Sequence, residues 1–322
     1  MVSPGAPTLA HLPERGERAE AALRHLGYRV SFSKHAFGMA DDGLTSGSPE
    51  ERAGDLRDAF ADPGVDALLI SDSGIGSQEL LPLLDSEVPT AVRKPLIGFC
   101  DTLYLHHYLA LVHGVGSYYG SSLIVHLGDV PGPFPETAGY LRRALAAEGP
   151  LECRPVGRRA RPLATWHDPA IEAAPRDRDY PGGWTWVREG SAEGPFYGGE
   201  IRSLPSVVDE FGLDYDGAVL FWDLDWDTGG DPPIGDMLTR LHSVTDLNRL
   251  AGMVVAANPY MDPEDWADLV GTVLARVLPG ASYPVLVNAD LSHAAPSWTV
   301  PFGEQVTLDP AAGLVFPRSG VR

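Results

Sequence analysis

The first half of the chain alternates apolar runs with helix-forming stretches, and this alternation limits the choice of fold more than any other feature. Predicted strands cover residues 28–32, 65–71 and 95–100, and predicted helices cover residues 14–26, 48–61 and 102–113. Residues 65–71 are mostly apolar and bounded by turn residues, as expected of a strand buried on both faces. Ser48-Pro-Glu-Glu51 has the pattern of a capping box. The alternation predicts an α/β fold with a mostly parallel sheet and helices on both faces.

Beyond residue 150 the sequence changes character. Residues 151–182 carry the basic cluster Arg158-Arg-Ala-Arg161 among proline, glycine and tryptophan residues, with weak periodicity, so we interpret them as a linker. Further strands are predicted at 184–188, 218–226, 252–258, 283–289, 298–302 and 313–317, and further helices at 232–242 and 263–277. We therefore expect an N-terminal α/β domain over residues 1–150 and a C-terminal β-rich domain over residues 183–322.

Charge and cysteine content exclude several classes of protein. The net charge is −20, from 24 basic and 44 acidic side chains, and such a surface repels nucleic acid and anionic membranes. No apolar run approaches the ~20 residues that span a bilayer, and no secretory signal is visible at the N-terminus. Two cysteines exclude a disulfide scaffold, so we expect a reduced, cytoplasmic protein.

Cys100 lies in the sharpest local motif, Lys94-Pro-Leu-Ile-Gly-Phe-Cys-Asp-Thr102. A buried strand runs into a reactive side chain and a helix begins at once, which is the layout of a nucleophile elbow. A helix N-terminus would lower the pKa of the thiol and favour the thiolate. The alternative is that Cys100 is a small buried apolar residue, as free cysteines often are. Cys153 has no comparable setting.

A second motif, residues 219–227, alternates cleanly and places Asp223, Asp225 and Asp227 on one face of a strand. Three carboxylates could bind a hard cation, but the run does not fit a calcium loop. We therefore interpret it as a strand that runs into an acidic loop and expect no metal; one carboxylate could orient a histidine. His293 follows a predicted strand beside turn residues, where it could reach a cleft.

The glycine-containing loop at residues 72–77 follows a predicted strand. It is too short and degenerate for a dinucleotide-binding motif, and a plain strand-to-helix turn explains it. Its backbone N–H groups could instead face an oxyanion. The chain has no Walker-type loop and no histidine–cysteine cluster at zinc spacing, so no cofactor is expected.

Taken in order, segments along nearly the whole chain resemble the LD-carboxypeptidase family of serine peptidases, which includes the microcin C self-immunity peptidases. The segments that carry the resemblance are Val2–Pro7, Ser46–Asp85, Lys94–Asp101, Gly198–Leu204, Leu220–Asp223 and Leu291–His293 followed by Pro301–Gly303. The resemblance implies an N-terminal domain similar to class I glutamine amidotransferases and a C-terminal β-rich domain. It also implies a homodimer and a Ser-His-Glu triad that cleaves amide bonds near a free carboxylate.

The sequence departs from the family pattern at four places. Cys100 stands where the family has the nucleophilic serine, and Asp223 stands where it has the catalytic glutamate. Asp72-Ser73-Gly74 replaces an Arg-Gly-Gly run, and Glu200 follows the glycine pair where asparagine is common. His293 matches the family histidine.

These replacements still leave a chemically competent site. We expect His293 to take the Cys100 proton, Asp223 to hold the imidazole tautomer, and the thiolate to attack a carbonyl. The N–H groups of Gly74 and Asp101 would stabilise the oxyanion. The resulting thioester could be hydrolysed or could pass its acyl group to an amine.

The same reading places Asp72, Ser73 and Glu200 at the substrate. The two carboxylates would disfavour a substrate carboxylate and suit a cationic or amine-bearing one. The predicted partner is therefore a small-molecule or peptide-like amide, ester or thioester. Two alternatives remain: a non-catalytic binder of a small ligand, and lyase or dehydratase chemistry in which Cys100 forms no covalent bond.

Overall fold

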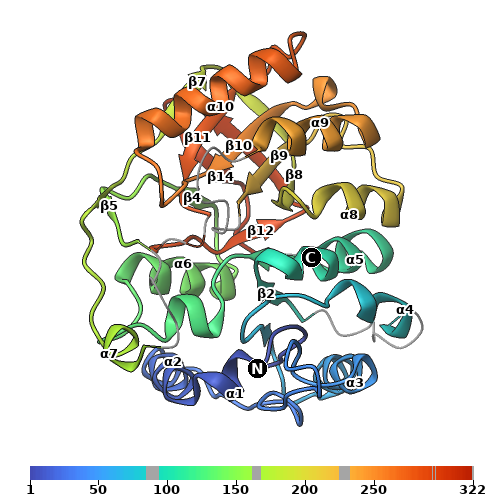
Figure 1. Ribbon diagram of the computed structural model, residues 1–322, viewed down its shortest axis with the longest axis vertical. Helices are drawn as coiled ribbons and strands as arrows, with labels where there is room; N and C mark the ends of the chain where they lie inside the picture. Colours follow the sequence, from blue (N-terminus) through green and yellow to red (C-terminus); the bar gives the residue numbers. More distant parts are fainter. Residues whose placement is uncertain (85–93, 162–167, 225–232, 292, 294, 321–322) are drawn as a thin grey trace.

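Two β-sheets, one in each half of the chain, form the frame of the molecule. The computed structural model describes residues 1–84, 94–161, 168–224, 233–291, 293 and 295–320. In Figure 1 the N-terminal half, blue to green, forms the lower part of the molecule, and the C-terminal half, yellow to red, forms the upper part. The predicted α/β fold with a parallel sheet and a β-rich C-terminal half is confirmed.

The N-terminal sheet has four strands in the order β1-β2-β3-β12. Their bounds are β1 Leu68–Leu69, β2 Leu96–Gly98, β3 Ser117–Tyr119 and β12 Val300–Phe302. The first three are parallel, whereas β12 pairs antiparallel with β3. Because β12 comes from the far end of the chain, the N-terminal sheet is completed by the C-terminal half (Figure 1).

Helices surround this sheet. They are α1 Thr8–His11, α2 Pro13–His25, α3 Pro49–Ala61, α4 Leu81–Leu84, α5 Leu103–Tyr108 and α6 Pro135–Ala146. Of these, α2, α3 and α5 match predicted helices, whereas α1 and α6 were not predicted. The capping box at the start of α3 is confirmed: the Ser48 hydroxyl accepts from the Glu51 N–H, and the Glu51 carboxylate accepts from the Ser48 N–H. The predicted strand at 28–32 was wrong. This segment forms no ladder; the Met1 amine donates to the Ser31 carbonyl, and the Arg24 guanidinium donates to the Val30 carbonyl.

The C-terminal sheet has eight strands in the order β4-β14-β13-β8-β9-β10-β11-β7. Their bounds are β4 Leu151–Cys153, β14 Gly313–Phe316, β13 Gln305–Asp309, β8 Ala192–Glu200, β9 Val219–Asp223, β10 Gly252–Ala256, β11 Val285–Ala289 and β7 Thr185–Arg188. The four central strands β8 to β11 run parallel and the outer ones are antiparallel. Helices α8 Leu204–Phe211, α9 Ile234–Val244 and α10 Pro263–Val277 accompany the parallel strands.

Two apolar clusters each contain residues from both halves of the chain. Leu103 of α5 belongs to the same buried cluster as Leu204 of α8 and Trp222 of β9. On the other face of β9, Phe221 packs in a second cluster that includes Phe302 of β12. The two sheets therefore hold each other in a fixed relation, because residues from both contribute to each cluster.

The segment expected to be a linker contains regular structure. β4 lies within it and forms one edge of the larger sheet, while β5 Arg158–Arg159 pairs with β6 Tyr180–Pro181. A short helix, α7 Pro169–Glu172, lies between them in the sequence. The segment is thus paired to the C-terminal half rather than simply spanning the two domains.

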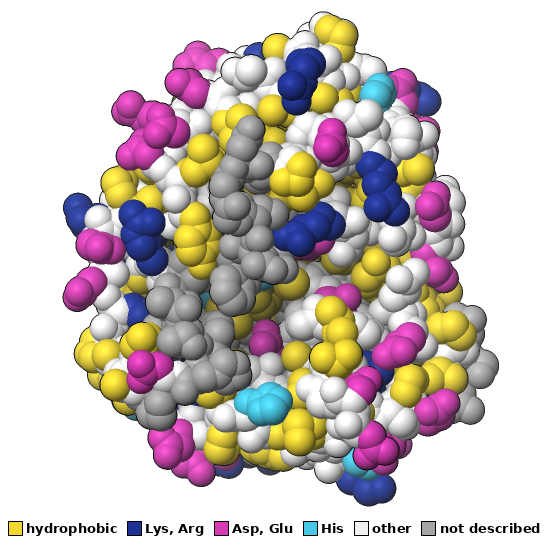
Figure 2. Space-filling view, in the orientation of Figure 1, with side chains coloured by type: hydrophobic (Ala, Val, Ile, Leu, Met, Phe, Trp, Pro, Cys, Tyr) yellow, Lys and Arg dark blue, Asp and Glu magenta, His cyan; other side chains and the backbone are white. Residues whose placement is uncertain are grey.

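The surface is acidic on the face shown in Figure 2, where Asp and Glu side chains are spread among fewer Lys and Arg side chains. The longest described helix, α10, has 15 residues. None of the helices in the described ranges combines the length and apolar character needed to cross a membrane.

Candidate active site

Cys100 lies at a sharp turn between a strand and a helix. β2 ends at Gly98, and a 3-10 turn over Cys100–Thr102 leads directly into α5. Cys100 has a φ of +56°, a conformation that is strained for a residue with a side chain and that tends to occur at functional sites. Its side chain is partly exposed, whereas Cys153 is buried and burial raises the pKa of that thiol. The predicted strand–turn–helix layout around Cys100 is confirmed.

The loop at residues 72–77 is bound to this turn. The Ser73 hydroxyl contacts the Phe99 carbonyl and lies 2.7 Å from the Thr102 hydroxyl. The Ser77 N–H donates to the Asp101 carboxylate at 2.7 Å, and burial raises the pKa of that carboxyl. Ser73 is buried, so its side chain fixes the loop to the turn and its hydroxyl points at protein groups.

Gly74 and Asp101, whose N–H groups are the predicted oxyanion donors, lie where the loop at residues 72–77 meets the Cys100 turn. Gly74 follows Ser73, and Asp101 follows Cys100 and binds the Ser77 N–H through its carboxylate. Gly74 has a φ of +64°, and a Cβ there would lie 2.4 Å from the Ala6 Cβ. Only glycine fits this position, because both the backbone conformation and the space exclude a side chain.

Asp223 and His293 meet beside the turn. Asp223 is the last residue of β9 and is 1% exposed, and its Oδ2 accepts a hydrogen bond from the Tyr119 hydroxyl at 2.8 Å. His293 Nδ1 lies 4.0 Å from the same Oδ2. The His293 ring packs edge-on against Phe99, the residue before Cys100, with 4.8 Å between ring centroids. Residues from three distant parts of the sequence are thus neighbours.

The segment that carries His293 is held by the expected linker. The Arg159 Nε donates to the Asp290 carboxylate at 2.7 Å, and both side chains are fully buried. The Val156 N–H donates to the other Asp290 oxygen at 3.2 Å. On the far side of His293, the Ala160 N–H donates to the Ala295 carbonyl at 2.7 Å. The linker therefore fixes the chain on both sides of the histidine.

The Gly198–Gly199 pair brings the two halves into contact at the site. A Cβ at Gly199 would lie 2.9 Å from the Leu103 Cβ, at the start of α5, and a Cβ at Gly198 would lie 1.8 Å from the Phe221 carbonyl oxygen. The two glycines have φ values of +155° and +145°. Close approach of β8 to the helix after Cys100 depends on the missing side chains.

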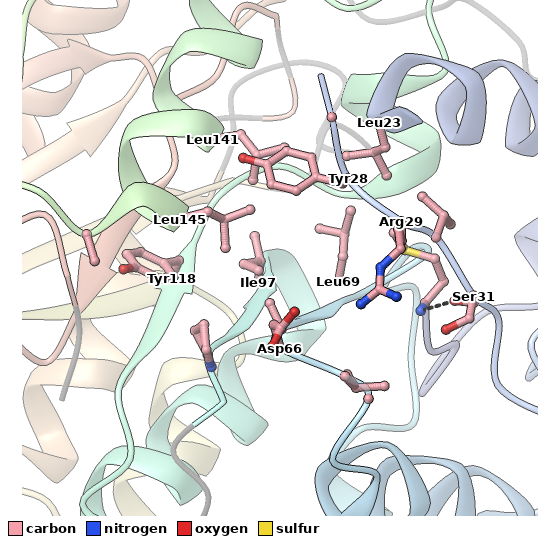
Figure 3. A pocket seen from close by; sticks show the side chains of 18 of the residues that line it. Leu23, Tyr28, Arg29, Ser31, Asp66, Leu69, Ile97, Tyr118, Leu141 and Leu145 are labelled. Atoms are coloured by element: carbon pink, nitrogen blue, oxygen red, sulfur yellow. Dashed lines mark hydrogen bonds between the residues drawn. The ribbon is translucent and has the colours of Figure 1, made fainter. Parts of the chain in front are cut away.

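A large cavity lies away from these groups. Its volume is about 680 Å³, and it extends over the N-terminal sheet toward the residues that precede β1, β2 and β3. Figure 3 shows its mixed lining, in which apolar residues such as Leu69, Ile97 and Leu141 lie together with Arg29 and Asp66. Cys100 follows β2 at the opposite end of the same strand, so this cavity is not part of the site described above.

Comparison with known protein families settles the membership of the chain. The model of the LD-carboxypeptidase N-terminal domain matches residues 1–120, and that of the LD-carboxypeptidase C-terminal domain matches residues 193–308. Together the two models cover most of the sequence. The chain belongs to the LD-carboxypeptidase family.

Related proteins in this family are similar along almost their entire length. Microcin C7 self-immunity protein MccF of Escherichia coli is 25% identical over 315 residues, which are 95% of this chain and 89% of MccF. A Bacillus subtilis protein named "Probable murein peptide carboxypeptidase" is 25% identical over 321 residues, which are 98% of this chain and 91% of that protein. The LD-carboxypeptidase relationship makes this chain a carboxypeptidase-like protein of a peptidase-like hydrolase family.

Solved structures of the LD-carboxypeptidase type have the same fold. MccF in complex with glutamyl sulfamoyl guanosine gives a TM-score of 0.84 at 21% identity, over 98% of this chain and 93% of that one. An MccF-like protein from Bacillus anthracis gives a TM-score of 0.84 at 23% identity, over 98% and 94% of the two chains. At this level of identity the likeness establishes the fold alone.

Two acidic residues, Asp72 and Glu200, were predicted to lie at the substrate of this LD-carboxypeptidase family member. Glu200 pairs with Asp223 across β8 and β9, but its carboxylate accepts from the N–H groups of Arg202 at 3.1 Å and Ser203 at 3.0 Å. The Asp72 carboxylate accepts from the Thr8 hydroxyl at 2.8 Å. Burial raises the pKa of both carboxyls. Both carboxylates therefore accept hydrogen bonds from protein groups, and Glu200 also lies 3.3 Å from the Arg202 guanidinium.

The acidic run after Asp223 lies largely outside the described residues, and this applies to Asp225 and Asp227 in particular. Within the described part of the chain, no group of three or more His, Cys, Asp or Glu residues is placed to hold a metal ion.

Sequence reasoning missed two residues that shape the site, Tyr119 and Arg159. Tyr119 lies at the end of an apolar strand, where a tyrosine needs no special explanation, and Arg159 lies in a basic cluster that resembles a solvated linker. No local signal identifies either residue, because their partners, Asp223 and Asp290, are more than 100 residues away in the sequence.

Proposed function

We propose that this chain is a cysteine-dependent hydrolase of the LD-carboxypeptidase fold, with Cys100 as nucleophile, His293 as general base and Asp223 as the residue that orients the imidazole. The observation that supports this most is the strained turn at Cys100, with φ of +56°, in the immediate neighbourhood of the Asp223–His293 pair. A thiol in such a turn, next to a histidine with a carboxylate behind it, is the arrangement of an activated nucleophile.

The geometry supports a two-step reaction. His293 presents Nδ1 to Asp223, which leaves Nε2 to accept the thiol proton of Cys100. The thiolate then attacks the carbonyl carbon of an amide, and the N–H groups of Gly74 and Asp101 stabilise the negative oxygen. The C–N bond breaks as His293 returns the proton to the leaving amine. Water, deprotonated by His293, hydrolyses the thioester and restores the thiol. Catalytic hydrogen bonds are often long without substrate, so a distance of 4.0 Å between Asp223 and His293 is compatible with this role.

The proposed substrate is a small amide that carries an amine or another cationic group. MccF has been crystallised with glutamyl and aspartyl sulfamoyl nucleosides, which are small acylated compounds. We expect the Asp72 and Glu200 carboxylates to favour a basic acyl group over an acidic one, with Arg202, 3.3 Å from Glu200, offsetting part of this charge. Because a thioester is readily attacked by amines, transfer of the acyl group to an amine is a second outcome of the same intermediate.

A paired-substrate assay tests this proposal. Lysyl and glutamyl sulfamoyl adenosine would be incubated with the wild-type chain and with Cys100→Ala, and the released amino acid would be measured by chromatography. We expect faster release from the lysyl compound, a hydroxylamine-sensitive mass increase on Cys100, and loss of both in Cys100→Ala. Turnover that persists in Cys100→Ala would contradict the nucleophile.

Thiol labelling provides an independent check that needs no substrate. We expect iodoacetamide to alkylate Cys100 ahead of Cys153, with a midpoint below the ordinary thiol pKa of ~8.5. Cys153 is an internal control because it is buried and its pKa is raised. A Cys100 thiol that titrates near the ordinary value would favour an inert remnant in a ligand-binding protein.

We also propose that the protein is a homodimer, as its resemblance to the family implies. Light scattering coupled to size-exclusion chromatography would give twice the chain mass of 34.5 kDa. A monomer mass at micromolar concentration would contradict this.

A further inference from the structure

The Tyr119 hydroxyl connects the nucleophile turn to the acid of the other sheet. Tyr119 ends β3 and pairs with Gly98 of the neighbouring β2, so it lies at the same end of the sheet as Cys100. Its hydroxyl donates to Asp223 Oδ2 at 2.8 Å and accepts from the Cys100 N–H at 3.2 Å. At 1% exposed, Tyr119 makes both contacts away from bulk water. One oxygen atom therefore touches both the main chain of the nucleophile and the side chain of the acid.

The direction of these two hydrogen bonds is fixed by their chemistry. A backbone N–H can only donate, so the Tyr119 oxygen accepts from Cys100 and its single proton goes to the Asp223 carboxylate. Burial, together with the charges of Asp223 and Cys100, raises the pKa of Tyr119 well above its ordinary value, so the proton stays on the phenol. The nearby His106 ring, 5.8 Å away between centroids, is neutral because burial lowers its pKa to about 3.

The packing around Tyr119 holds the hydroxyl in this position. Its ring contacts Phe221 edge-on at 4.7 Å between centroids, and Phe221 lies on the same face of β9 as Asp223. On the other side of β3, strand β12 pairs Val300 with Tyr119. Both halves of the molecule thus pack against the ring, and this packing fixes the position of the hydroxyl.

We infer that Tyr119 is a positioning residue, which holds the Asp223 carboxylate for His293 and engages the Cys100 N–H so that this N–H does not serve the oxyanion. This inference rests on the proposed function. Asp223 Oδ2 is shared between the Tyr119 hydroxyl and the His293 side, so the phenol fixes the carboxylate and stabilises it as an anion. The donors left for the oxyanion are the N–H groups of Asp101 and Gly74.

The test compares Tyr119→Phe with Tyr118→Phe. Both remove one buried hydroxyl from β3, but the Tyr118 hydroxyl donates to the Ala144 and Ser319 carbonyls, away from Cys100. The readout is the pH profile of iodoacetamide alkylation at Cys100, measured by peptide mass spectrometry at equal folded fraction. Loss of a hydrogen bond to a carboxylate corresponds to about one pH unit.

We expect Tyr119→Phe to shift the profile upward by about one unit, because the Asp223 carboxylate is no longer held toward His293 and therefore supports the imidazolium and the thiolate less. Tyr118→Phe should keep the wild-type profile. With a turned-over substrate, Tyr119→Phe should lower kcat by roughly 10- to 100-fold and leave KM unchanged. An unshifted profile in folded Tyr119→Phe overturns the inference.

A second background tests the route through Asp223. In Asp223→Asn, the further change Tyr119→Phe should cause a smaller shift than in the wild type, because the carboxylate is gone and only the contact with the Cys100 N–H is lost. An equal shift in both backgrounds overturns the inference. If Tyr119→Phe does not fold, 3-fluorotyrosine at position 119 keeps the hydroxyl and makes it a stronger donor. The profile should then move to lower pH, and an unchanged profile overturns the inference.

The same measurements separate this inference from the proposed function. A wild-type Cys100 that titrates near the ordinary thiol pKa of ~8.5 overturns both. A wild-type Cys100 that titrates well below this value, with Tyr119→Phe behaving identically, overturns the positioning role of Tyr119 and leaves the nucleophile in place.

Discussion

The two ends of the N-terminal sheet are built from the same three parallel strands and differ in almost every other respect. At the carboxyl end, Cys100, Tyr119, Asp223 and His293 lie together, and two of them come from the C-terminal half. The cavity toward the amino end has about 680 Å³ of space and a lining in which apolar residues such as Leu69 lie beside Arg29 and Asp66 (Figure 3).

The largest open volume described above and the candidate catalytic residues therefore lie at opposite ends of the same sheet. In the cavity region, apolar side chains contribute burial, and substitutions there should change stability. At the carboxyl end, the second sheet supplies polar partners that the first sheet lacks, so substitutions there should change reactivity. The predictions below test this division, from the largest expected effect to the smallest.

Cys100→Ala should reduce turnover by at least about 10³-fold and leave the melting temperature nearly unchanged, because it removes the nucleophile and retains the backbone. Cys153→Ala provides the opposite case, since Cys153 is fully buried in the C-terminal sheet and should affect stability without abolishing turnover. Steady-state kinetics and thermal melting of both variants measure this. A Cys153→Ala variant that is as stable as the wild type but inactive would contradict the assignment of Cys153 to stability and Cys100 to reactivity.

The buried histidines behind the carboxyl end should make stability depend on pH. Burial lowers the pKa of His106 from 6.5 to about 3, so between these values the unfolded state binds a proton that the folded state does not. The free energy of unfolding should therefore fall as pH decreases from 6.5, by up to about 1.4 kcal/mol per pH unit for this group.

His106→Gln tests this slope, because glutamine can still donate toward the Gly98 carbonyl and accept from Ser117, as His106 does. Urea denaturation at several pH values should show a shallower dependence in this variant. If the free energy of unfolding depends on pH equally in the wild type and in His106→Gln, groups other than His106 cause the loss of stability in acid.

Gly199→Ala should destabilise the molecule by about 1–3 kcal/mol and slow Cys100 alkylation, because the new Cβ would press on Leu103 at the start of α5. Gly132→Ala is the matched control, since nothing lies within 4 Å of a Cβ there. Denaturant melts and alkylation rates measure both effects. Normal alkylation in Gly199→Ala would show that the site tolerates a shift between the two halves.

Ile97→Val in the cavity lining should cost about 0.5–1.5 kcal/mol and leave alkylation of Cys100 unchanged. Ile97 is 1% exposed and lies in β2, three residues before Cys100. This variant therefore tests whether a change in the cavity lining alters the reactivity of Cys100. Altered alkylation without a change in stability would contradict their independence.

Local sequence predicted the elements whose signals are short-range. The capping box at Ser48 and the strand–turn–helix at Cys100 depend on neighbouring residues, and both are confirmed. β8 escaped prediction because Gly194, Pro195 and the glycine pair lower strand propensity, and pairing with β9 and β13 overrides that preference.

The sequence by itself determined the α/β class and the positions of most strands, because periodicity and turn chemistry are local properties of the chain. Its resemblance to the LD-carboxypeptidase family supplied the candidate nucleophile, base and acid. Only the tertiary structure decided that β12 completes the N-terminal sheet, that Arg159 fixes the segment before His293, and that Tyr119 joins Cys100 to Asp223. Apart from the Tyr119–Cys100 contact, each of these joins residues more than 100 positions apart. They form only when both sheets are packed, because a hydrogen bond between buried groups is specified by their positions in space rather than by their neighbours in sequence.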